Sequence, residues 1–104
     1  MAVSLQQWLE RCKAEGSMPI PADDPVYAYA DRVGISTEIL ALHWAEFKLR
    51  RGESTKRQAD WRATFRNSVR DNWYRIWYIG PGQPAQLTTT GRQALAAHSV
   101  AAAA

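Results

Sequence analysis

Glycine and proline divide this chain into short segments, and their positions limit the helices that it can form. Gly16, Gly34 and Gly52 each follow a run of residues with helical spacing, which is where a residue in left-handed conformation most often ends a helix. The segment 80–84 contains two further glycines and two prolines. Because proline lacks an amide proton and disfavours helical geometry in the residue before it, we expect no helix to cross that segment. The sequence therefore predicts short helices with breaks between them.

The expected helices begin after residues that can cap them by accepting a hydrogen bond from a free amide of the first turn. These residues are Ser4, Asp24 before Pro25, Ser36, and Ser54 or Thr55. We expect helices over residues 5–15 and 25–33, a third of about four turns that ends near residue 52, and a fourth, the longest, that runs through residue 78. The fold class that follows is all-α, a small compact bundle of three to four helices.

The composition changes after Pro84. Residues 83–90 are polar, and the last dozen residues are mainly alanine. An isolated alanine-rich helix of this length is only marginally stable in water and offers little apolar surface to bury. We therefore expect one domain over residues 1–82 and a flexible tail over residues 83–104 that is disordered or weakly helical. No alternation of the kind that predicts strands occurs along the chain.

The composition also restricts where the protein works. A chain of 104 residues is the size of one domain. Its single cysteine, Cys12, cannot form an internal disulfide, which fits a reducing compartment. The N-terminus does not have the pattern of a signal peptide, and no apolar stretch approaches the roughly 18 residues of a membrane span. We expect a cytoplasmic protein that does not bind membranes.

No group of residues resembles an active site. His43 stands alone in a helical core pattern, where packing explains it better than catalysis does. Asp23 and Asp24 are neighbouring carboxylates, but Asp24 is explained as a helix cap, and no further ligands stand at metal spacing. The Gly-Pro-Gly segment at residues 80–82 lacks the pattern of a phosphate-binding loop. We expect no enzyme, and therefore no catalytic residue, no bound metal and no cofactor.

The charges are distributed unevenly along the chain. Residues 1–40 carry three basic and six acidic side chains, a net charge of −3. Residues 41–104 carry ten basic and four acidic side chains, a net charge of +6. This asymmetry favours a polyanionic partner for the second part of the chain.

The expected fourth helix has an inward face and a basic stripe beside it. At about 100° per residue, the inward face contains Trp61, Phe65, Val69, Asn72 and Ile76. The neighbouring stripe contains Arg62, Arg66, Arg70, Trp73 and Trp77. Arginine pairs with phosphates and tryptophan offers a face for base stacking, so this stripe suits single-stranded nucleic acid. The same helix could also lie in the major groove of a duplex. Alternatively, the two tryptophans complete the core and the arginines form a solvated face.

Further basic residues surround the turn before this helix. Arg50 and Arg51 precede Gly52 in a pattern that suits phosphate contact, although solvated charges at the end of a helix are the other interpretation. Lys48, Lys56 and Arg57 enlarge the patch. The candidate nucleic-acid-binding residues are therefore Arg50, Arg51, Lys56, Arg57, Arg62, Arg66, Arg70, Trp73 and Trp77.

The run EFKLRRGESTKRQADWRATFRNSVRDNWYRIW resembles the C-terminal domain of bacteriophage replication-initiation proteins and of the primosomal protein DnaT. The residues that carry the resemblance are Arg57, Asp60, Trp61, Phe65, Arg66, Asn67, Val69, Arg70, Asn72 and Trp73. The upstream segment 23–35 also resembles this phage group. The resemblance implies a small helical bundle that binds single-stranded DNA and helps to load the replicative helicase. Ser68 stands where the family usually has tryptophan, so a neighbouring side chain must fill that space if the tryptophan packs.

Two functions from different classes follow. The first is a single-stranded-DNA-binding module of a phage or primosome-type replication protein, with the replicative helicase or its loader as an implied partner and self-association as a further possibility. The second is a small phage protein-interaction module that uses the same basic surface against an acidic partner. That partner would be a helicase, a loader, or a host nucleic-acid-binding defence complex that the protein inhibits. A transcription factor that reads duplex DNA is a third hypothesis.

Overall fold

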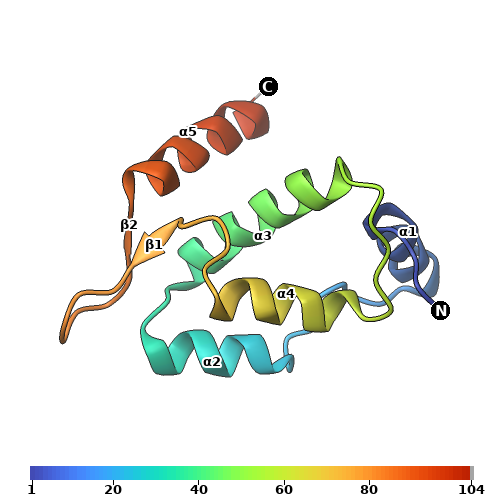
Figure 1. The fold of residues 1–104 in the computed structure, drawn as a ribbon, viewed down its shortest axis with the longest axis horizontal. Coiled ribbons are helices and arrows are strands. Elements are labelled where there is room, and N and C mark those ends of the chain that lie inside the picture. The colour runs from blue at the N-terminus through green and yellow to red at the C-terminus, as the bar shows by residue number, and fades with distance from the viewer. Residues whose placement is uncertain (104) are drawn as a thin grey trace.

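Five helices and a two-stranded hairpin follow one another in the part of the chain that this computed structural model describes, residues 1–103, with side chains described as far as Ser99 (Figure 1). The elements are α1 (Leu5–Glu15), α2 (Pro25–Val33), α3 (Thr37–Gly52), α4 (Trp61–Arg70), β1 (Trp77–Tyr78), β2 (Gln86–Leu87) and α5 (Thr89–Ala103). The prediction of a compact, mostly helical domain is confirmed.

Side-chain caps begin the first three helices at the predicted residues. Ser4 accepts a hydrogen bond from the Gln7 amide, and the Gln7 side chain accepts one from the Ser4 amide, so both groups satisfy donors that the helix leaves free. Asp24 caps α2 by accepting from the Val26 amide, and Ser36 caps α3 by accepting from the Ile39 amide. The fourth helix begins later than expected. Its cap is Asp60, which accepts from the Ala63 amide.

The core lies around α3, against which α1, α4 and α5 all pack. Phe47 is fully buried at its centre, and its ring meets Phe65 edge to face at a centroid distance of 5.2 Å and Trp61 at 6.1 Å. Such edge-to-face pairs add to the gain from burying the rings themselves. Val69 is also buried on α4, as expected for the inward face, and Ile76 is buried beyond the end of that helix.

The fourth helix ends at Arg70 instead of continuing through residue 78. Asn72 adopts a φ of 49°, a left-handed conformation that asparagine tolerates better than most residues. Its side-chain amide donates to the Trp77 carbonyl at 2.8 Å, which holds the chain as it turns away from α4. The residue that fits poorly on the inward face of a long helix therefore lies just beyond the C-terminal cap, Asp71, of the shorter helix.

Residues 83–103 differ from the expected flexible tail. β2 pairs antiparallel with β1, so that Trp77 stands opposite Leu87. Ala85 is buried, and its amide donates to the Gly34 carbonyl at 2.8 Å. The following α5 packs on α3, and the boundary expected at residue 82 is not the end of the packed structure. The alanine-rich helix is therefore not isolated, contrary to the expectation, because the hairpin places it against α3. Residue 104 lies outside the described residues.

Two close contacts place the start of α5. The Thr88 hydroxyl accepts from the Gly91 amide at 2.9 Å, which caps the first turn, and the Thr88 amide donates to the Ile76 carbonyl at 3.0 Å. Gly91 is buried so tightly against Ile76 that a Cβ atom there would overlap the Ile76 carbonyl oxygen. Among residues 1–103, no helix has both the length and the apolar character of a membrane span.

Gly91→Ala is therefore expected to destabilise the protein by about 1–3 kcal/mol, the usual cost of overfilling a packed site. In an open helical position the same change would stabilise by up to about 1 kcal/mol, so the sign of the effect identifies the contact. Urea unfolding measures it, and hydrogen exchange should show faster exchange in α5. Ser99→Ala, an exposed change in α5, is the control. A Gly91→Ala variant as stable as the parent would contradict this packing of α5.

Candidate nucleic-acid interface

The nine residues expected to contact nucleic acid do not form one stripe along a helix. Since α4 ends at Arg70, Trp73 lies in the turn after it and Trp77 begins β1. Trp77 is only 5% exposed, and its ring lies 5.2 Å from that of His43. Trp77 is therefore a core residue and not a surface for stacking bases, which corrects the expectation for this position.

Two of the three stripe arginines hold α4 against the segment that precedes α2 and against the residue that caps α2. The Arg62 guanidinium donates to the carbonyls of Pro19, at 2.7 Å, and Met18, at 2.9 Å. Arg66 forms an ion pair of 3.0 Å with Asp24, whose other carboxylate oxygen caps α2. These guanidinium groups position neighbouring segments of the protein, and Arg70 is the stripe arginine that remains exposed.

Arg50 and Arg51 at the end of α3 instead meet the turn that follows α4. The Arg51 guanidinium carbon lies 4.8 Å from the ring centroid of Trp73, and that of Arg50 lies 5.0 Å from the ring of Tyr74. The two rings meet edge to face at 6.5 Å. Trp73 keeps 37% of its surface exposed. We call these four residues the Arg51–Trp73 cluster. Its two pairs are each separated by more than 20 positions in the sequence, so helical spacing could not have found them.

Glu46 contacts this cluster through Arg50. It is largely buried, and its carboxylate accepts hydrogen bonds from Arg50 Nε at 2.6 Å and from His98 Nε2 at 2.9 Å. Burial opposes the charge of Glu46, but the hydrogen bonds from Arg50 and His98 outweigh it and hold the pKa of its carboxyl below the ordinary value. Burial raises the pKa of the Tyr74 phenol. An ionised carboxylate beside the cluster therefore partly compensates Arg50, whereas Arg51 has no acidic partner among the ion pairs of the described residues.

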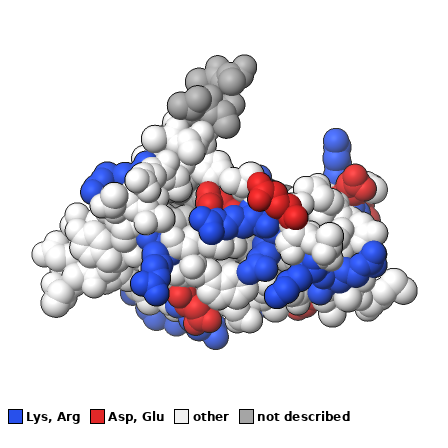
Figure 2. All heavy atoms as spheres, turned by 45° about the horizontal axis from the view of Figure 1, so that its top comes forward, with Lys and Arg blue, Asp and Glu red and all other residues white. Residues whose placement is uncertain are grey.

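Other basic side chains lie on the surface near these elements. Lys56 and Arg57 are exposed in the loop between α3 and α4, and Arg70 and Arg75 are exposed on either side of the turn. Lys and Arg side chains recur across one face of the molecule, with some acidic side chains among them (Figure 2). The face is predominantly basic but mixed, so single positions and not an unbroken stripe define the candidate interface.

Ser68, the position at which the resembling family usually has tryptophan, is fully buried. Its hydroxyl donates to the Phe65 carbonyl at 2.6 Å and lies 2.9 Å from His43 Nε2. Since the single hydroxyl proton goes to Phe65, Nε2 of His43 carries a proton and donates it to Ser68. The rings of Tyr74 and Trp77 lie 5.1 and 5.2 Å from His43. His43 and these aromatic rings therefore fill the space beside the small serine side chain.

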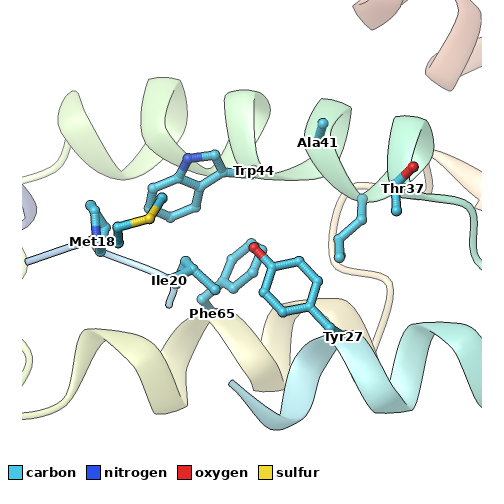
Figure 3. A pocket seen from close by; sticks show the side chains of 9 residues that line it. Met18, Ile20, Tyr27, Thr37, Ala41, Trp44 and Phe65 are labelled. Carbon is cyan, nitrogen blue, oxygen red and sulfur yellow. The ribbon is translucent and has the colours of Figure 1, made fainter. Parts of the chain in front are cut away.

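A separate apolar groove lies on the other side of α3, between α2, α3 and the segment 18–20 (Figure 3). It has a volume of about 320 Å³, and Tyr27, Trp44 and Phe65 contribute aromatic walls. Met18 at its edge is 65% exposed. None of its lining side chains carries a charge, so this groove does not suit phosphate. A second cleft, of about 280 Å³, lies between α3 and α5 beside Arg50 and Tyr74 and includes polar and charged side chains.

Comparison with known proteins does not identify any additional site. No family model matches the chain, and no match was found among curated proteins or solved structures. In the described residues, no group of three or more histidine, cysteine, aspartate or glutamate side chains is arranged to hold a metal ion. The candidate interface is therefore defined by the Arg51–Trp73 cluster and the exposed basic residues near it.

His43 is expected to make stability fall on acidification. Burial lowers the pKa of His43 to about 4, against an opposing effect of Glu46, whereas the unfolded chain titrates near 6.5. Between these values the unfolded state binds the proton and the folded state does not, so stability is complete above pH 6.5 and is lost as the pH falls toward 4. The shift corresponds to about 3 kcal/mol.

His43→Gln keeps an N–H donor for Ser68 and removes the titration. Urea unfolding at a series of pH values should show a steeper loss of stability for the parent than for the variant between pH 6.5 and 4.5, above the range where Glu46 titrates. His98 is present in both proteins, so its contribution cancels. Parallel stability curves would contradict the buried neutral state of His43.

Proposed function

We propose that this chain binds single-stranded DNA through the Arg51–Trp73 cluster. The observation that carries the proposal is the Arg51 guanidinium lying 4.8 Å over a tryptophan ring that remains 37% exposed. A guanidinium offers a planar set of donors for phosphate, and an exposed indole offers a face for a base. Together they suit one nucleotide of an unpaired strand, whose bases are free to leave the stack.

The role of α4 favours a single strand over a duplex. A helix that reads the major groove needs its polar face free to reach base edges. In α4 the side chains of Arg62 and Arg66 are directed to carbonyls of segment 18–19 and to Asp24. A flexible single strand, by contrast, can follow separate basic positions such as Arg51, Arg70 and Arg75 around the turn after α4.

The resemblance to phage replication-initiation proteins supplies the setting for this proposal, a replication protein of phage or primosome type. A second candidate function is a protein-interaction module whose partner is acidic. The observation that favours it is the ion pair between Arg50 and Glu46, because it demonstrates that a carboxylate fits beside the cluster. The two candidates differ in whether affinity depends on unpaired bases.

Arg51→Ala should reduce the salt dependence of single-strand binding. Each phosphate contact removed should flatten the slope of log affinity against log salt by about 0.7, because one fewer counterion equivalent is released. Fluorescence anisotropy with a labelled oligothymidylate measures the slope. Arg32→Ala, which removes an exposed charge at the end of α2, is the matched control and should leave the slope near the parent value. Arg66→Ala should lower the melting temperature instead, because it leaves Asp24 buried without its partner.

Trp73→Ala should weaken the same binding by roughly 1–3 kcal/mol while leaving the salt slope almost unchanged, since stacking releases no counterions. Thermal unfolding serves as the control, because a half-exposed ring should contribute little to the core. If Arg51→Ala and Trp73→Ala both bind like the parent, the cluster is not the interface. If no oligonucleotide binds but Arg51→Ala loses an acidic protein partner, the second candidate replaces the first.

A further inference from the structure

We propose that the cleft between α3 and α5 receives one unpaired nucleobase of a strand whose backbone lies on Arg50 and Arg51. This inference rests on the proposed function and specifies what the interface recognises, namely a base in addition to phosphate. The cleft and the Arg51–Trp73 cluster share two side chains, because Arg50 and Tyr74 belong to the cluster and also line the cleft. A strand held at the cluster therefore has the cleft within reach of its next nucleotide.

The size of the cleft selects a small ligand. Its volume of about 280 Å³ lies just below the roughly 300–1,000 Å³ that ligand sites occupy. On its α5 side the cleft is lined in part by Ala94 and Ala97, whose side chains are short, and Leu49 and Ile76 contribute larger apolar side chains. One ring system fits this space better than a peptide segment or a duplex would.

The polar groups of the cleft match the edge of a base. A nucleobase has apolar faces and a rim of donors and acceptors. Thr90 and Gln93 bring a hydroxyl and an amide to the lining, and both are exposed. Tyr74 also lines the cleft, and its hydroxyl oxygen is buried.

The charges around the cleft favour a nucleotide over a free anion. Glu46 lines the cleft as an ionised carboxylate, which would repel a phosphate placed deep inside it. Its charge is compensated by Arg50, whose side chain is 55% exposed at the surface. A nucleotide with its phosphate at Arg50 and its base directed into the cleft keeps the phosphate beside a cation and away from Glu46. This orientation places the negative group outside and the uncharged ring inside.

A substitution that fills the cleft tests this proposal. Ala97→Phe places a ring in the space proposed for the base, and Ala96→Phe adds the same ring to an exposed neighbour that does not line the cleft. Each protein is titrated by anisotropy with an oligothymidylate and with an abasic deoxyribose-phosphate strand of equal length. We expect Ala97→Phe to weaken binding of the oligothymidylate by about tenfold, the effect of losing one base contact, and to leave the abasic strand unchanged. Ala96→Phe should behave like the parent with both strands.

A second measurement needs no variant. In the parent protein, amide signals of Gln93, Ala94 and Ala97 should shift in NMR spectra when oligothymidylate is added and stay in place with the abasic strand. Should Ala97→Phe bind both strands like the parent, with no such shifts, the cleft does not hold a base, although loss of binding in Arg51→Ala would still support the proposed function. Should the parent bind neither strand, the proposed function fails and this inference fails with it. Shifts at the cleft produced by an acidic peptide, without any DNA binding, would assign the cleft to a protein partner.

Discussion

The left-handed turn at Asn72 determines the arrangement of everything after α4. With φ at 49° and its side-chain amide donating to the Trp77 carbonyl, Asn72 follows the C-terminal cap Asp71 of α4 and directs the next residues back across α3. That reversal places Trp73 beside Arg51, brings Tyr74 against His43, and buries Trp77 at the start of the hairpin that carries α5. If α4 had continued to residue 78, the aromatic side chains would instead lie along one helix.

Arginines at similar positions in the sequence have different physical roles in the fold. Arg62 and Arg66 satisfy carbonyls and a buried carboxylate of the segment 18–24, so their charges stabilise the packing of α2 on α4. Arg51 stands over an exposed ring and has no acidic partner among the described ion pairs. Charge compensation therefore separates structural arginines from candidate binding arginines better than helical spacing does, because spacing places Arg62 and Arg66 on the same face as the exposed Arg70.

Signals between residues close in the sequence predicted the first half of the fold. The caps at Ser4, Asp24 and Ser36 and the buried positions of Trp61 and Phe65 follow from local chemistry and from helical spacing. The second half depends on contacts between distant residues. Asn72 bears a turn signal that the helical pattern obscured, strands of two residues leave no alternation to detect, and the pairing of Arg51 with Trp73 exists only after the chain has turned. The candidate site could therefore be predicted as a set of residue types, but not as an arrangement.

Glu46 joins two parts of the molecule through one carboxylate. One oxygen accepts from Arg50 of the Arg51–Trp73 cluster, and the other accepts from His98 of α5. A ligand that breaks the ion pair between Arg50 and Glu46 would change the electrostatic environment of His98. A change in the packing of α5 would likewise change the interaction of Glu46 with Arg50. Because such linkage is reciprocal, the free energy by which an occupant of the cluster alters α5 must equal that by which α5 alters the affinity for the occupant. The alanine-rich helix is thus linked to the basic surface through Glu46, although it contributes none of the arginines in that cluster.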